Sequence, residues 1–455
     1  MKLKSWIRQS GIVWRCWGMG SKWIECELGD VLELKRGYDL PKTARLEGRT
    51  PVVSSSGVSG FHNESKVTAP GVVTGRYGTI GEVFYLDNDF WPLNTTLYVR
   101  DFKGNDPLFI YYLLKTLSYS DYTDKAAVPG INRNHIHKAK VKIPENVDCQ
   151  KKIAQKLRNL DNKVLLNRQI NLTLEIMAQT LFKSWFVDFD PVIDNALDAG
   201  FFEQNAELPE ELLHRAETRR KLRASDDYIP LPDALRQQFP AAFELCSEPS
   251  LGLRGWVPLT WTVNTAGDVF TVKGGSTPST ANPEFWEGGD FHWTSPKDLS
   301  GGSDKILLTT ERKITSAGLQ KISSGLLPPE TVLMSSRAPV GYLALTKIPT
   351  AINQGYIAIT ETKCLSPEFT LYWLDSNMDI IKSMSGGTTF AEISKKTFRG
   401  IQLVIPSIDV VSFFSTIVGS YLSKITKNSE ECSTLEDLRD YLLPRLINGE
   451  FEVNS

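Results

Sequence analysis

Residues 150–187 read QKKIAQKLRNLDNKVLLNRQINLTLEIMAQTLFKSWFV, and this stretch decides the fold. Its seam positions are separated alternately by four and three residues, the heptad spacing of a coiled-coil helix. The seam is Ile153, Leu157, Leu160, Val164, Asn167, Asn171, Leu174, Ala178, Leu181 and Trp185. The same pattern recurs 261 residues later at Phe414, Val418, Tyr421, Ile425, Asn428, Cys432, Leu435, Arg439, Leu442 and Leu446. A long helix that is apolar only along one seam needs a second helix against it, so the duplication predicts a helix pair.

The two helices are expected from about Gln150 to Val187 and from about Asp409 to Asn448. Each would be roughly 57–60 Å long at a rise of about 1.5 Å per residue. Asn167 and Asn428 occupy equivalent seam positions, and a buried Asn weakens a coiled coil but fixes its register. Antiparallel pairing would place both near a pseudo-two-fold axis. The alternative, in which both lie at a frayed or solvated point, stays open at this level.

A module of short strands and turns precedes each helix. VVTGRYGTIG at 72–81 corresponds to VLMSSRAPVG at 332–341, and each motif places one Arg on a tight loop after a buried strand. PLNTTLYV at 92–99 likewise matches AINQGYIA at 351–358. We therefore predict an α+β fold in which two β-rich α/β domains are joined by two long antiparallel coiled-coil helices, as an internal pseudo-two-fold repeat.

This organisation divides the chain into six segments. They are an N-terminal extension (1–22), a first β-rich domain (23–147), a first helical spacer (148–187), a charged linker (188–255), a second β-rich domain that opens at Trp256 (256–406), and a second helical spacer (407–455). We interpret the linker as solvated, with one charged helix from Glu210 to Arg223. Residues 1–18 are expected to be an upstream translation product or, alternatively, a basic arm.

Composition is that of an ordinary soluble protein. Hydrophobic residues make up 41% of the 455 residues and charged residues 23%. No apolar run of about 20 residues indicates a membrane span, so a cytoplasmic protein without membrane contact is expected. The six cysteines form no C-x-x-C pair, which argues against zinc and disulfides. The net charge of −2 hides a basic start and an acidic linker, so DNA binding would depend on local basic patches and on partners.

Catalytic motifs are absent from the sequence. It contains no Gly-rich cofactor loop, no phosphate-binding loop and no (N/D)-P-P-(Y/F) tetrapeptide for a flipped base. His135 and His137 lack further ligands nearby, so no metal site is expected. We therefore expect a chain that is not an enzyme by itself.

What remains is a recognition surface on the predicted loops. Arg pairs with guanine and Asn with adenine, while Ser, Thr and Lys hold phosphates. The candidate DNA-binding residues in the first module are Lys35, Arg36, Ser55, Asn63, Arg76, Tyr77, Asn132, Arg133 and Asn134. Those in the second are Lys273, Ser276, Thr277, Trp293, Thr294, Lys297, Arg337, Lys395 and Lys396.

From Trp23 onward, the chain resembles the DNA-specificity subunits of type I restriction-modification systems. The motifs that carry the resemblance are GGSTP at 274–278, FWEGG at 285–289, FHWT at 291–294, SSRAPVG at 335–341, LFKSWFVDFDP at 181–191 and LLPRLINGE at 442–450. The resemblance implies that each domain reads half of an asymmetric bipartite site in double-stranded DNA. The helices would then act as a ruler spanning at most about 17 base pairs.

The resemblance also implies partners. Two methylation subunits would use S-adenosylmethionine to methylate an adenine in each half-site, and two restriction (motor-nuclease) subunits would use ATP and Mg. This chain would bind none of these cofactors. We expect the partners to dock on the helices, including Phe182, Trp185, Phe186, Leu443 and Ile447; the alternative is that these side chains pack within the helix pair.

Two other functions compete with this interpretation. One is a specificity subunit of another restriction class, paired with a fused methylase-nuclease chain. The other is a structural adaptor whose modules bind protein or carbohydrate and not DNA.

Overall fold

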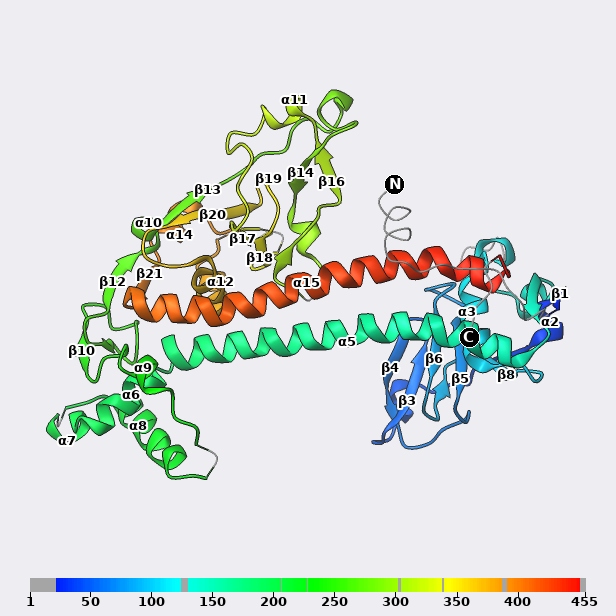
Figure 1. The fold of residues 1–455 in the computed structure, drawn as a ribbon, viewed down its shortest axis with the longest axis horizontal. Coiled ribbons are helices and arrows are strands. Elements are labelled where there is room, and N and C mark those ends of the chain that lie inside the picture. Colours follow the sequence, from blue (N-terminus) through cyan, green and yellow to red (C-terminus); the bar gives the residue numbers. More distant parts are fainter. Residues whose placement is uncertain are drawn as a thin grey trace. The chain divides into compact units, whose positions relative to one another are not determined.

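The computed structural model describes residues 22–123, 130–205, 207–226, 228–301, 304–337, 339–386 and 391–450. The chain divides into two compact units. Unit 1 comprises the residues up to Leu166 and those from Cys432 onward, and unit 2 comprises Asn167–Glu431. Helices α5 (Val147–Phe186) and α15 (Ile408–Ile447), each 40 residues long, contribute to both units (Figure 1). The extension predicted for residues 1–22 lies, apart from Lys22, outside the described residues.

The two long helices pack antiparallel within each unit. In unit 2, the ring of Phe182 on α5 lies 5.7 Å from that of Phe414 on α15. In unit 1, Arg439 Nη1 on α15 forms an ion pair with Asp161 Oδ1 on α5 at 2.9 Å. Positions on α15 rise as their partners on α5 fall, and the twenty predicted seam residues are all buried or half-buried. The heptad seam predicted from the sequence is confirmed.

Asn167 and Asn428 are buried and hydrogen-bonded across the pair. Asn428 Nδ2 donates to Asn171 Oδ1 at 2.8 Å, and Asn167 Nδ2 donates to Glu431 Oε2 at 2.8 Å. The alternative of a frayed or solvated point is therefore wrong. A slipped register would leave these buried polar groups unpaired, at a cost of about 1–3 kcal/mol each.

The β-rich parts of the two units share one topology. Unit 1 contains the sheets β2-β8-β5-β6 and β4-β3-β7, and unit 2 contains β13-β20-β17-β18-β15 and β16-β14-β19. Equivalent strands occur in the same order in the sheets of the two units, except that unit 2 has an additional edge strand, β15. In each three-stranded sheet one pair is parallel, β3 with β7 and β14 with β19. The duplication seen in the helices therefore extends to the strands.

The strands of unit 1 are β1 (Trp23–Glu27), β2 (Glu33–Arg36), β3 (Thr50–Ser54), β4 (Gly57–His62), β5 (Gly71–Gly75), β6 (Val83–Leu86), β7 (Trp91–Pro92), β8 (Thr96–Asp101) and β9 (Lys140–Pro144). Those of unit 2 are β10 (Phe243–Leu245), β11 (Trp256–Pro258), β12 (Thr262–Thr265), β13 (Phe270–Lys273), β14 (Phe291–Thr294), β15 (Ile306–Leu307), β16 (Arg312–Ile314), β17 (Val332–Ser335), β18 (Leu343–Thr346), β19 (Thr350–Ile352), β20 (Tyr356–Thr362) and β21 (Gln402–Ile405).

The shorter α-helices of unit 1 are α2 (Leu28–Val31), α3 (Pro107–Lys115) and α4 (Arg133–Ile136). Those of unit 2 are α6 (Asp190–Asp198), α7 (Phe201–Gln204), α8 (Glu210–Arg223), α9 (Asp233–Arg236), α10 (Ala266–Val269), α11 (Ser316–Leu319), α12 (Pro367–Ser376), α13 (Met378–Ser383) and α14 (Lys395–Arg399).

Helices α3 and α12 attach each module to α5. Each begins with Pro after a capping residue: the Asp106 carboxylate accepts from the N–H of Phe109 at 2.8 Å, and Ser366 Oγ accepts from that of Phe369 at 3.0 Å. On α3, Tyr112 OH donates to Asp161 Oδ2 at 2.6 Å, and burial together with this hydrogen bond raises the pKa of Tyr112. The module is thus tied to the helix by a hydrogen bond as well as by packing.

The second module begins differently from the prediction. Trp256 lies in β11, which pairs with β10 of the linker. The strand pair equivalent to β1–β9 is β12–β21, so Trp261, which directly precedes β12, corresponds to Trp23. Trp256 begins a short strand that lies between Gly255 and Pro258. In the sequence this strand of the linker hairpin therefore resembles the first strand of a domain.

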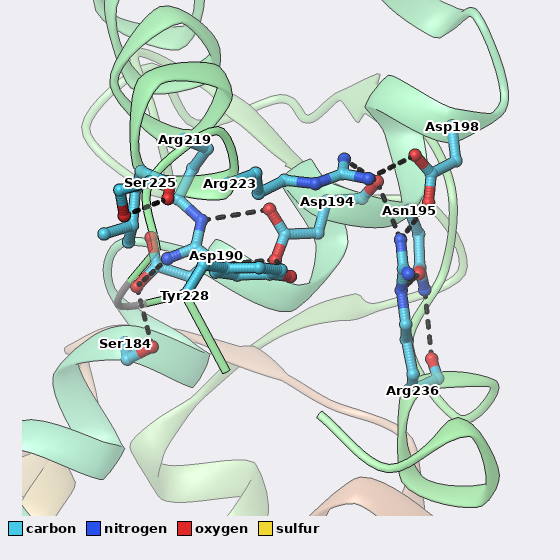
Figure 2. Close-up of polar contacts among 11 residues, drawn as sticks. Ser184, Asp190, Asp194, Asn195, Asp198, Arg219, Arg223, Ser225, Tyr228 and Arg236 are labelled. Atoms are coloured by element: carbon cyan, nitrogen blue, oxygen red, sulfur yellow. Dashed lines mark hydrogen bonds and ion pairs between the residues drawn. The ribbon is translucent and has the colours of Figure 1, made fainter. Parts of the chain in front are cut away.

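The linker folds instead of remaining solvated, which corrects our interpretation. Helices α6 to α9 bury Val192, Ile193, Leu212 and Leu235 in the core of unit 2. Figure 2 shows the polar contacts between α6 and α8: Arg219 bonds both carboxylate oxygens of Asp194, and Arg223 donates to Asp198 at 2.6 Å. Carboxylates four residues apart on α6 thus face guanidiniums four residues apart on α8.

The surroundings of two carboxyl groups in this network shift their pKa values in opposite directions. Burial raises the pKa of Asp190. Although burial opposes it, hydrogen bonds from Arg223 and Arg236 hold the pKa of Asp198 below its usual value. The acidic composition of the linker therefore reflects internal ion pairing as well as surface charge.

Among the described residues, α15 alone is long and apolar enough, by length and composition, to span a membrane, with a mean hydropathy of 1.2 over its most apolar window. Its apolar residues follow the heptad seam, and Phe414, Val418 and Ile425 are buried in the core of unit 2. This is the pattern of a core helix.

Candidate DNA-recognition surface

In unit 1, predicted site residues gather at one end of the four-stranded sheet. Strand β2 ends at Arg36 and β5 ends just before Arg76, and both strands flank β8. The N–H of Gly37 donates to the Thr96 carbonyl at 3.1 Å, and that of Arg76 donates to the Thr95 carbonyl at 2.9 Å. Because both strands end beside the start of β8, Arg36 and Arg76 lie at the same sheet end.

Helix α4 joins this sheet end through two hydrogen bonds. The N–H of Ile131 donates to the Arg76 carbonyl at 3.0 Å, and Arg76 Nε donates back to the Ile131 carbonyl at 3.4 Å. Asn132 then caps α4 by accepting from the N–H of Asn134 at 3.0 Å. Arg133 and Asn134 are exposed on this helix, so amide and guanidinium groups are presented next to Arg76.

Three further predicted residues lie around this cluster. The Arg76 guanidinium lies 4.6 Å from the ring centre of Tyr77, and Lys35 Nζ lies 5.5 Å from that of Tyr38. A Cβ on Gly78 would lie 3.5 Å from Ser55 Oγ, which places the β3–β4 turn against the loop that follows Tyr77.

Asn63 does not belong to this cluster. It follows β4 at the opposite end of the hairpin from Ser55, about 20 Å away for a six-residue strand. Its residue type suggested base contact, but hairpin length separates it from the other candidates.

Unit 2 repeats the arrangement. Strands β13 and β17 flank β20; β13 ends at Lys273, and β17 ends one residue before Ser336 and two before Arg337. The N–H of Ser336 donates to the Gly355 carbonyl at 2.8 Å, and its carbonyl accepts from the N–H of Ile393 at 3.0 Å. The second bond brings the segment leading to α14 and its exposed residues Lys395 and Lys396 to this sheet end.

Two close contacts complete the unit 2 cluster. Lys395 Nζ lies 2.2 Å from where a Cβ on Gly274 would stand, so it is directly beside the end of β13. Thr277 Oγ1 donates to Gln354 Oε1 at 2.7 Å.

The two clusters correspond element by element. A cation ends the first strand (Arg36, Lys273), an Arg follows the second (Arg76, Arg337), and a capped helix supplies further cations. Each cluster also contains a glycine that lies too close to a neighbouring backbone to carry a side chain. A Cβ on Gly37 would lie 2.2 Å from the Leu93 carbonyl oxygen, and a Cβ on Gly275 would lie 1.8 Å from the Ile352 carbonyl oxygen. Each unit thus presents a basic, amide-bearing sheet end.

Two candidates in unit 2 are buried, and the hydroxyl of a third is bonded to the backbone. Trp293 and Thr294 are buried, with exposed fractions of 5% and 0%. Trp293 Nε1 donates to the Ser276 carbonyl at 3.3 Å, and the Thr294 hydroxyl shares a 3.1 Å hydrogen bond with Tyr356. Ser276 Oγ itself donates to the Lys321 carbonyl at 3.2 Å. The prediction of DNA contact is thus wrong for Trp293 and Thr294, whose motif supports the core, and Ser276 uses its hydroxyl internally.

Lys297 is exposed, but Glu311 offsets its charge. Its Nζ lies 2.8 Å from Glu311 Oε2, and this hydrogen bond, with the charge of Glu311, raises the pKa of Lys297. It offers a weaker attraction for phosphate than the cations of the cluster.

The predicted partner-docking side chains are mostly internal. Phe182, Trp185, Leu443 and Ile447 are buried, and Phe186 is half-buried against the core of unit 2. They pack within their units, as the alternative held, because large aromatic and aliphatic side chains on a seam gain most from burial.

Two exposed groups escaped the sequence reasoning. Gln354 stands at the unit 2 sheet end, and the repeated motif at 92–99 and 351–358 could have indicated it. The Arg312 guanidinium lies 3.5 Å from the ring centre of Trp286, and no sequence pattern marked it.

The described residues contain no group of three or more His, Cys, Asp or Glu that could hold a metal ion. His137 serves the backbone: its Nε2 accepts from the N–H of Leu34 at 3.0 Å. Burial, followed by the nearby Arg133, lowers the pKa of His137 and favours the neutral form that accepts this bond.

Duplicated modules with matching basic sheet ends, combined with an antiparallel helix pair in each unit, define a two-module recognition protein. The chain belongs to the type I restriction modification DNA specificity domain family, whose model matches residues 20–176 and 258–431. It is 30% identical to the HindI specificity subunit of Haemophilus influenzae over 95% of this chain and 92% of that protein. It is also 34% identical to the MjaIX specificity subunit of Methanocaldococcus jannaschii, over 39% of this chain and 41% of that protein.

Among solved structures, the fold is similar to that of a type I restriction-modification S subunit from M. genitalium. The TM-score is 0.57 at 16% identity, over 96% of this chain and 98% of the other. The predicted fold class and family are confirmed, and the role is that of a DNA sequence-specificity subunit.

Proposed function

We propose that this chain reads a bipartite, asymmetric DNA site, with one half-site recognised by residues 23–147 and the other by residues 261–406, which begin at the equivalent of Trp23. The observation that carries the proposal is the repeated sheet end, which presents Arg36, Arg76 and Arg133 in unit 1 and Lys273, Arg337 and Lys395 in unit 2. Arg side chains pair bidentately with guanine in the major groove, and Lys holds phosphates. Because the side chains differ between the clusters, the half-sites differ in sequence.

The helix pair sets the distance between the half-sites. A helix of 40 residues is about 60 Å long, which corresponds to at most about 17 base pairs. Buried asparagines and aromatic seam residues fix the register of α5 against α15, and a ruler needs a fixed register.

The partners follow from membership of a type I system. Two methylation subunits that use S-adenosylmethionine would modify an adenine in each half-site, and two restriction subunits would use ATP and Mg. Exposed apolar side chains on α5, namely Leu172, Ile176 and Met177, are better docking points than the buried residues predicted from sequence. The complex would act on DNA in the cytoplasm.

The test is to map adenine methylation in a methylation-deficient host that expresses this chain with its cognate methylation subunit. We expect methylated adenines in two unlike half-sites separated by a constant gap. Methylation at one continuous site, or at half-sites with a variable gap, would exclude the bipartite ruler.

Replacing either loop arginine should weaken one half-site only. Removing a bidentate Arg costs about 1–3 kcal/mol of discrimination, so Arg337→Ala should lower binding roughly tenfold or more and relax the second half-site. Arg76→Ala should do the same for the first. Fluorescence anisotropy of the complex with methylation subunits measures both, and Lys221→Ala, an exposed cation on α8 of the linker, is the matched control. Equal losses for Lys221→Ala would show that charge alone matters.

A further inference from the structure

Two adjacent residues attach the second module to the helix pair at a place where the first module has no equivalent strand. Asp304 and Lys305 directly precede β15, the additional edge strand of the five-stranded sheet. The Lys305 carbonyl accepts from the N–H of Leu345 on β18 at 2.8 Å, so this dipeptide is bonded into the sheet. All residues of the contact lie within unit 2.

Asp304 joins both long helices. Its Oδ2 accepts from Asn171 Nδ2 on α5 at 3.1 Å and from Ser429 Oγ on α15 at 2.6 Å. Asn171 also donates to Ser429 Oγ at 3.0 Å and accepts from the seam residue Asn428. The loop of the module therefore enters the same hydrogen-bond network that fixes the helix register.

Lys305 joins α5 to the module's own helix α12. Its Nζ bonds Glu175 Oε1 on α5 and Asp375 Oδ2 on α12, the latter at 2.9 Å. Tyr372 OH on α12 donates to the other oxygen of Glu175 at 2.9 Å, and Glu175 is 8% exposed. A buried carboxylate with a specific cation and a tyrosine partner has few alternative geometries, because any shift leaves a charge unpaired.

We propose that Asp304 and Lys305 are positioning residues that hold the second recognition module at a fixed place on the helix pair and so determine which spacer lengths the protein accepts. This inference rests on the proposed bipartite function. The sheet end with Arg337 and Lys273 belongs to the same five-stranded sheet as β15, so a displacement at the dipeptide moves the reading surface with it. Loosening the contact should leave the bases read by each module unchanged but make the gap between them less strict.

The experiment measures methylation by the full complex on duplexes that carry both half-sites at the native spacer or at one base pair more or less. Lys305→Met removes the cation, and Asp304→Asn weakens the bond to α15. Glu175→Gln combined with Lys305→Met also removes the buried carboxylate, so that only the more exposed carboxylate of Asp375 loses its cation. Lys347→Met is the control, because it removes an ion pair with Glu330 in the same module away from α5 and α15.

We expect the ratio of native-spacer to altered-spacer methylation to fall roughly tenfold in the Lys305 and Asp304 variants, within the usual range of coupling between sites. The half-site sequences should be unchanged, and the control should keep the wild-type ratio. If a thermal melt shows that Lys305→Met is not folded, the methylation ratio of the double variant is used instead. An unchanged ratio in folded variants, or an altered half-site sequence, would overturn the assignment. A wild-type complex with no spacer preference would instead refute the ruler itself.

Discussion

Insertion of one heptad into each long helix, after Leu166 and after Glu431, should reduce methylation of the native site by about 100-fold or more. Seven residues preserve the seam and lengthen each helix by about 10 Å. Misplacements of about 1 Å can already cost around 100-fold in a positioned reaction. Activity should reappear on sites whose spacer is longer by up to about three base pairs, which a spacer series of duplexes measures.

The matched control for this insertion is seven residues placed after Ser250, in an exposed turn of the linker hairpin. It adds the same length of chain outside the helices, so the native spacer should be retained. A shifted spacer in the control, or an unshifted one in the helix variant, would mean that the helices do not set the distance.

Asp194→Ala should destabilise unit 2 by about 3–5 kcal/mol, because it leaves the half-buried Arg219 without its main partner. Asp194 accepts from Arg219 Nε at 3.0 Å and from Tyr228 OH at 3.1 Å, and its side chain is only 7% exposed (Figure 2). Urea denaturation followed by tryptophan fluorescence is suitable, because Trp185 and Trp261 are buried in the same core.

Glu217→Ala is the control for this prediction. Glu217 pairs with Lys221 at 3.5 Å on the outer face of α8, where both side chains are more than half exposed. Exposed pairs contribute about 0–1 kcal/mol, so its midpoint should scarcely move. Similar losses in the two variants would contradict a stabilising role for the ion pairs between α6 and α8.

The sequence was most informative where one periodic pattern had a single physical solution. Twenty seam positions at heptad spacing require a helix partner, and the repeat offset identified it, so α5 and α15 were predicted to within a few residues.

The linker and the site were harder to predict because they depend on contacts distant in sequence. Asp194 and Arg219 look like solvated charges until α6 and α8 face each other. Trp293 and Thr294 are of residue types that often contact DNA, yet their side chains on β14 are buried in the core. Asn63 is exposed, but the β3–β4 hairpin places it away from Arg76, and its contact with DNA stays a prediction. The loop arginines were selected because each follows a buried strand in both copies, and their contact with DNA stays a prediction.

Exchange of residues 261–406 for the corresponding module of another family member, followed by methylation mapping with the same methylation subunit, tests the central claim most directly. Two modules that read independently on one ruler predict that the second half-site changes, while the first half-site and the spacer length stay as they were. An unchanged site, or simultaneous change of both half-sites, would contradict this account.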